Sequence, residues 1–138
     1  MTDLLPIPPI ETATDPIQSP ADMRERWRAL MGPLGFGERL LWVGFVGKDR
    51  RMYKTLTQSP IGRHPNHALV DKLLSALSTV LADFERGTTV ALLLTRPGRD
   101  SVSPDDERWS ETLTRVAQTV GLTLEPIFRA NDTALVEI

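Results

Sequence analysis

Residues 90–128 contain a strand, a helix and a second strand in succession, and this order restricts the fold more than any other feature. Residues 90–95 form an almost uninterrupted apolar run, residues 104–120 have apolar side chains at helical spacing, and residues 122–128 are again largely apolar. Two strands joined through a helix lie parallel in one sheet, and the helix covers a face of that sheet. The sequence therefore predicts a parallel strand pair with a helix packed on it.

The segments before and after this unit predict further strands and helices. Residues 20–31 have the pattern of a short amphipathic helix, with Ser19 as its N-cap and Pro20 at its first position. The other predicted elements are a hairpin with its turn at residues 47–50, a long helix over residues 69–84 and a last strand over residues 134–138. We therefore expect an α/β fold, in which a central mixed sheet carries helices on its faces.

The composition is typical of a single globular domain, with 138 residues and a hydrophobic content of 41%. Residues 1–19 are rich in proline, which removes backbone donors and favours extended geometry, so we expect an extended or disordered tail there. Whether the apolar residues of this tail dock on a partner stays open. Residues 20–138 are expected to form one domain, with its core in residues 36–138.

Several classes of protein are excluded or disfavoured by what the sequence lacks. It has no cysteine, which excludes disulfides, zinc–thiolate sites and cysteine nucleophiles and fits a reducing compartment. No apolar run approaches the length that crosses a membrane, and the first residues do not have the pattern of a signal peptide. We expect a cytoplasmic protein with no membrane partner.

The segment between the strand at residues 90–95 and the following helix has the position of a ligand-binding loop, because α/β sheets commonly bind ligands at the carboxyl ends of strands. Ser103 and Asp106 open the helix here, and capping alone accounts for both. Arg96 needs another explanation, because a charge at the end of a buried strand is costly without a partner. Arg96 is therefore the residue that most strongly indicates a special arrangement.

These residues, together with the order of the elements, resemble the JAB/MPN (JAMM) domain and most closely its RadC-type branch, over residues 36–138. In that family an early strand supplies a Glu, a middle strand ends in H-x-H-P, and S-x-x-D opens the next helix. Here Glu38 precedes the first strand, residues 94–97 read LTRP in place of H-x-H-P, and Ser103 and Asp106 fit S-x-x-D. The segment IGRHPNHALVDKLL is also similar to the RadC-type loop that leads into the long helix.

The resemblance implies a zinc site that this sequence no longer completes. In the family the two histidines and the Asp hold zinc, and the Glu acts on the zinc-bound water. Leu94 cannot ligate a metal, and the guanidinium of Arg96 is permanently cationic without a free lone pair. We therefore expect no metal, cofactor or catalytic residue, and a vestigial site made of Glu38, Leu94, Arg96, Ser103 and Asp106. Arg96 should pair with Asp106 or Glu38.

Three functions remain open on these grounds. The first is a catalytically inactive JAB/MPN domain that acts as a protein-interaction or scaffold module, with a link to DNA metabolism through its RadC-type character. The second is weak nucleic-acid binding through phosphates, by a basic segment that contains Lys48, Arg50, Arg51, Lys54 and Arg63. The third is a hydrolase with a non-standard site. The histidine pair His64 and His67 lies in another loop, and we do not expect it to bind a metal.

Overall fold

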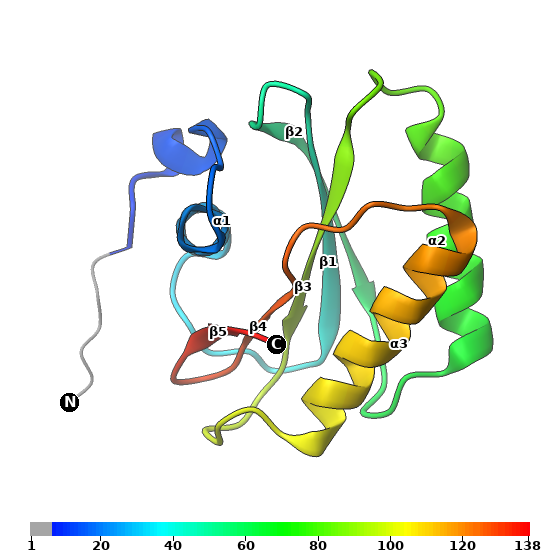
Figure 1. Ribbon diagram of the computed structural model, residues 1–138. Helices are drawn as coiled ribbons and strands as arrows, with labels where there is room; N and C mark the ends of the chain where they lie inside the picture. Colours follow the sequence, from blue (N-terminus) through cyan, green and yellow to red (C-terminus); the bar gives the residue numbers. More distant parts are fainter. Residues whose placement is uncertain (1–6) are drawn as a thin grey trace.

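The computed structural model describes residues 7–138, which form a five-stranded sheet with helices on both faces (Figure 1). The strands are β1 (Leu40–Val46), β2 (Met52–Pro60), β3 (Thr89–Thr95), β4 (Phe128–Ala130) and β5 (Leu135–Glu137). Their order in the sheet is β2-β1-β3-β4-β5. Only β3 and β4 run parallel, and the other neighbours are antiparallel. The predicted mixed sheet, with its hairpin and its parallel pair, is confirmed.

The sheet separates two apolar layers, and each layer is covered by helices. Helix α1 (Pro20–Met31) covers one face of the sheet, and α2 (His67–Leu81) and α3 (Pro104–Val120) cover the other (Figure 1). Strands β1 and β3 lie in the middle of the sheet and are buried on both faces, which explains their nearly continuous apolar sequences. Among the described residues, no helix is both long and apolar enough to cross a membrane.

Local signals place the ends of α1 and α3 where the sequence predicts them. The side chain of Ser19 accepts a hydrogen bond from the backbone N–H of Asp22, and Ser103 and Asp106 form a reciprocal capping box. Gly121 ends α3 in the left-handed conformation, with φ of 80°. Helix α2 begins earlier and ends earlier than the apolar periodicity over residues 69–84 predicts.

The predicted strand over residues 122–128 is wrong in its extent. Thr123 and Glu125 bond to Val90 at the start of β3, but the regular ladder begins only at Phe128. Pro126 has no backbone N–H to donate, so the pairing with β3 breaks there and resumes two residues later. The final strand is likewise shorter than residues 134–138 and is limited to β5.

The predicted extended or disordered tail over residues 1–19 is wrong for the part that the structure describes. Ile10–Thr14 form a 3-10 helix, η1, and the side chain of Ile17 is buried. The N–H of Ile17 donates to the carbonyl of Arg50 at 2.7 Å, and Arg50 Nε donates to the carbonyl of Ile17 at 3.0 Å. The prolines exclude a long helix but not one 3-10 turn, and burial of Ile17 beneath α1 favours the docked arrangement. Residues 1–6 lie outside the described residues.

Truncation of Ile17 tests whether this segment belongs to the domain. Ile17→Ala should lower the free energy of unfolding by about 2–5 kcal/mol, because it leaves a cavity in the layer beneath α1. Ile10→Ala is the matched control, since Ile10 is 59% exposed and its truncation should change stability by no more than about 0.5 kcal/mol. Chemical denaturation of the two variants measures both values, and equal small effects would contradict the docked segment.

Candidate functional site

Three elements meet where β3 ends and α3 begins. Arg96 directly follows β3, and its backbone N–H donates to the carbonyl of Ala130 in β4. Asp106 lies in the first turn of α3, inside the capping box. Arg129 lies in β4 opposite Leu94 of β3, so its side chain points to the face of the sheet that α3 covers. The fold thus brings Arg96, Asp106 and Arg129 together from segments that are far apart in the sequence.

The guanidinium of Arg96 is fully engaged by its surroundings. Its Nε and Nη2 donate to Asp106 Oδ1 and Oδ2, both at 2.8 Å, in a bidentate ion pair. Its Nη1 and Nη2 also donate to Asp100 Oδ1 and Oδ2 at 2.9 and 3.1 Å, and Nη1 donates to the carbonyl of Pro97. All five N–H groups that an arginine side chain carries therefore have an acceptor. Arg96 is 6% exposed and Asp106 is 2% exposed, so the bidentate pair is buried.

A second buried arginine approaches the same carboxylate. Arg129 is 1% exposed, and its Nε lies 3.2 Å from Asp106 Oδ2. The geometry is an ion pair rather than a hydrogen bond, because Nε and Nη1 of Arg129 have no hydrogen-bond partner in the described part of the chain. Asp106 Oδ2 is already occupied by Arg96 and by the backbone N–H of Ser103. The carboxylate of Asp106 therefore faces two cations and accepts three hydrogen bonds.

The loop that follows β3 is fixed by the turn between β4 and β5. The backbone N–H of Gly98 donates to Asp132 Oδ2 at 3.0 Å, and Asn131 Nδ2 donates to the carbonyl of Asp100 at 2.8 Å. Gly98 has φ of 125°, and a Cβ atom there would come within 2.7 Å of Arg96 Nη1. Glycine is thus required for backbone conformation and for space. This loop holds Asp100 over the outer side of the Arg96 guanidinium.

The electrostatics of the cluster favour the ionised forms of its carboxylates. Burial alone raises the pKa of Asp106, but hydrogen bonds from Arg96 and from the Ser103 backbone outweigh burial and bring this pKa below its usual range. The hydrogen bonds of Arg96 also lower the pKa of Asp100. Burial lowers the pKa of Arg129, whereas the bond to Asp106 raises the pKa of Arg96. At neutral pH the cluster therefore contains two cations and two carboxylates, one of them at the surface.

The prediction that Arg96 pairs with Asp106 is confirmed, and the alternative partner Glu38 is not used. Glu38 lies two residues before β1 and is exposed, and the carboxylates that bond to Arg96 are Asp106 and Asp100. Asp100 and Arg129 were not predicted from the sequence. For Arg129 a signal exists, because it is a charge next to the apolar pair Ile127 and Phe128, the same kind of pattern that drew attention to Arg96.

The chemistry of these residues does not fit the zinc that the resemblance implies. Leu94 is a core residue with 3% exposure and offers no ligand atom. Both oxygens of Asp106 accept hydrogen bonds, and Arg96 presents only donors. Over residues 7–138, no three His, Asp or Glu side chains are grouped in a way that could hold a metal ion. His64, from the other loop, is instead bound to Asp105, with Nδ1 3.2 Å from Oδ1.

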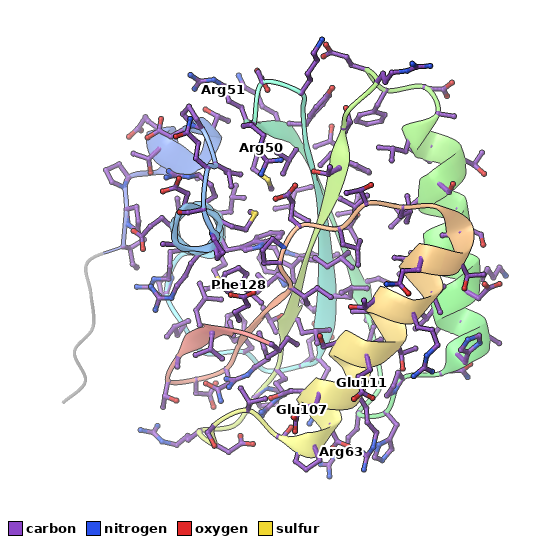
Figure 2. The ribbon with its side chains drawn as sticks, in the orientation of Figure 1. Arg50, Arg51, Arg63, Glu107, Glu111 and Phe128 are labelled. Atoms are coloured by element: carbon purple, nitrogen blue, oxygen red, sulfur yellow. The ribbon has the colours of Figure 1, made fainter. Side chains whose placement is uncertain are left out.

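The basic residues that suggested nucleic-acid binding do not form one surface. Arg50 pairs with Glu125 through two hydrogen bonds of 2.8 and 2.7 Å, and Arg51 donates to the carbonyl of Thr14. Arg63 lies near the start of α3, at the opposite end of the molecule from Arg50 and Arg51 (Figure 2). Lys48 and Lys54 are exposed. Two of the five cations are thus engaged in holding the hairpin turn, and the set is divided between two ends of the protein.

Comparison with known proteins identifies no relative of this chain. No family model matches the sequence, and neither the curated proteins nor the solved structures include a match. Assignment of the chain to a family therefore depends on its own residues and geometry.

Removal of the Arg96 side chain should be among the most destabilising single changes in this protein. Arg96→Ala leaves a buried carboxylate without its bidentate partner, which typically costs about 3–5 kcal/mol. Arg99→Ala removes an exposed arginine from the same loop and should stay within about 0.5 kcal/mol of the wild type. Urea denaturation of both variants provides the comparison, and a small effect of Arg96→Ala would show that the pair contributes little.

The lowered pKa of Asp106 predicts a loss of stability in acid. A group whose pKa is depressed in the folded state stabilises the protein above its unfolded pKa, about 3.9 for Asp, and this contribution disappears as the pH falls through the folded pKa. Asp106→Asn should therefore give a shallower decrease in the free energy of unfolding between pH 5 and pH 2 than the wild type. Asp83→Asn, at an exposed position, should keep the wild-type slope. Identical slopes in all three proteins would contradict the role of Asp106.

Proposed function

We propose that this chain is a catalytically inactive, RadC-like JAB/MPN domain that acts as a protein-interaction or scaffold module. The observation that carries the proposal is the direct contact between Arg96 and Asp106. These residues stand at the end of a middle strand and at the start of the next helix, where the family has a zinc-binding histidine and its aspartate. Contact between the two positions supports the same arrangement of strand end and helix start as in the family. The guanidinium provides a fixed positive charge where the family has a metal ion.

Inactivity follows from the chemical state of the site. Hydrolysis by this family requires a metal with an open position, where a bound water loses a proton near neutral pH. Leu94 and Arg96 supply no lone pair, and the carboxylate of Asp106 is ionised but fully engaged by donors. Glu38 is exposed, and the carboxylates that pair with Arg96 are Asp100 and Asp106 instead. The cluster instead stabilises the fold.

An interaction role is supported by the apolar surface that the domain leaves open. An open groove of about 270 Å³ lies between the end of β2, α2 and the start of α3. Its apolar lining residues include Leu41, Pro60, Ile61, Leu69, Leu73 and Trp109. Such a groove suits an apolar protein segment better than a charged small substrate. We place the protein in the cytoplasm as part of the same proposal, because a chain without cysteine needs no oxidising compartment.

Metal content tests this proposal when the missing ligands are restored. Leu94 lies in β3 and Arg96 directly follows the strand, so their side chains point to the same side of the sheet, as those of alternate residues in an extended chain do. If residues 94, 96 and 106 stand at the positions of the family's zinc ligands, Leu94→His combined with Arg96→His should create a site that binds one zinc per chain together with Asp106. Elemental analysis of the wild type should give no stoichiometric zinc, and chelators should leave its melting temperature unchanged.

The triple variant that adds Asp106→Asn is the control and should lose the zinc that the double variant gains. One zinc per wild-type chain would overturn the proposal of a metal-free domain. A folded double variant that binds no zinc would remove the support for a JAB/MPN-like placement of these three residues.

A further inference from the structure

The outer edge of β2 is an unused pairing surface. Strand β2 has nine residues and lies at one end of the sheet, with β1 on its inner side and no other strand beside it in the described part of the chain. Edge strands expose backbone N–H and C=O groups that can pair with another strand. Proteins usually block such edges with charges, prolines or bulges, so the sequence of this edge decides what it can bind.

Little in β2 protects its central part. Lys54 is its only charged residue, and Pro60 is its last residue. Thr55, Thr57 and Gln58 are exposed and uncharged. The irregularity in the ladder with β1 lies between Gly44 and Val46, which is the end near the hairpin turn, so the half of β2 from Leu56 to Pro60 is regular. The edge therefore has an open stretch that another strand can approach.

The hydrogen bonds of the hairpin determine which groups of β2 point outward. The N–H of Ile61 donates to the carbonyl of Arg39, so residues 61, 59 and 57 bond to β1 in the alternating pattern of an antiparallel pair. The N–H and C=O groups of Leu56 and Gln58 then face the open side. Pro60 faces the same side, which is where a missing N–H does not disturb the sheet.

We propose that β2 pairs with β2 of a second copy of this chain, antiparallel, about a two-fold axis at Thr57. In this register Leu56 of each chain lies opposite Gln58 of the other, so the outward groups of these two residues bond to one another. Thr57 lies opposite Thr57, and Thr55 lies opposite Ser59, which places small hydroxyl side chains in cross-strand pairs. Lys54 lies opposite Pro60, so no like charges meet.

Two grooves extend this interface beyond the strands. On the face of the sheet that α2 covers, the groove of about 270 Å³ includes Ser59, Pro60 and Ile61, next to the place that the partner's Thr55 would take. On the other face, a groove of about 400 Å³ includes Lys54, Leu56 and Leu30 of α1. The self-complementary register, together with apolar surface on both sides of it, favours a second copy over an unrelated strand. The inference does not depend on the Arg96–Asp106 pair, and either can fail alone.

Disulfide cross-linking gives a direct test of the register, because the chain has no cysteine of its own. Thr57→Cys introduces one thiol at the two-fold axis. Residues opposite one another in a non-hydrogen-bonded pair have Cα atoms about 4.5 Å apart, within the range of a disulfide. Thr57→Cys should therefore form a covalent dimer under mild oxidation. Thr55→Cys is the matched control and should not, because the two copies of residue 55 would be about 14 Å apart along the strands.

Molar mass in solution tests the dimer itself. Light scattering should give twice the monomer mass of 15.4 kDa for the wild type. Thr57→Lys places two ammonium groups opposite each other and should raise the dissociation constant about tenfold or more, with an unchanged melting temperature for the isolated chain. Thr55→Lys, opposite Ser59, should remain dimeric.

Three results would overturn the inference, and none of them bears on the ion cluster. The first is a monomeric wild type at high micromolar concentration. The second is a dimer that Thr57→Lys leaves unchanged. The third is cross-linking of Thr55→Cys as fast as that of Thr57→Cys.

Discussion

The bidentate contact between Arg96 and Asp106 ties together the end of β3, the start of α3 and, through Arg129, strand β4. Neither partner could be buried alone, because an isolated charge in an apolar interior is strongly unfavourable. Each residue therefore requires the other to be buried. Their contact fixes the start of α3 against the end of β3. The capping box of Ser103 adds a further donor to the same carboxylate, so helix initiation and ion pairing depend on one side chain.

The same contact determines what the site can do. A carboxylate that is held ionised beside two arginines accepts no proton near neutral pH, and both oxygens of Asp106 already accept hydrogen bonds. The position that α/β folds often use for chemistry is thus occupied by a buried ion pair. The surface that we propose for an interaction lies elsewhere, at the outer edge of β2 and in the two grooves beside it.

Sequence alone predicted those features that depend on neighbouring residues. The caps at Ser19 and Ser103 are local, so the helices that follow them were placed correctly. The pairing of Arg96 was predictable because a charge at the end of an apolar strand needs a counter-ion close by. For Arg129 the adjacent apolar residues were a signal of burial, but its contact with Asp106 was not predictable, since it depends on the register between β3 and β4. The docking of Ile17 was missed for the same reason, because its partners come from the distant hairpin turn.

A double-mutant cycle on Arg96 and Asp106 tests the central claim most directly. The cycle compares Arg96→Met, Asp106→Leu and the double variant by chemical denaturation at neutral pH. If the two side chains form one structural unit, the double variant should be less destabilised than the sum of the single variants, by about 1–3 kcal/mol. Additive effects, within about 0.5 kcal/mol, would show that the residues act independently and would contradict the account of this site.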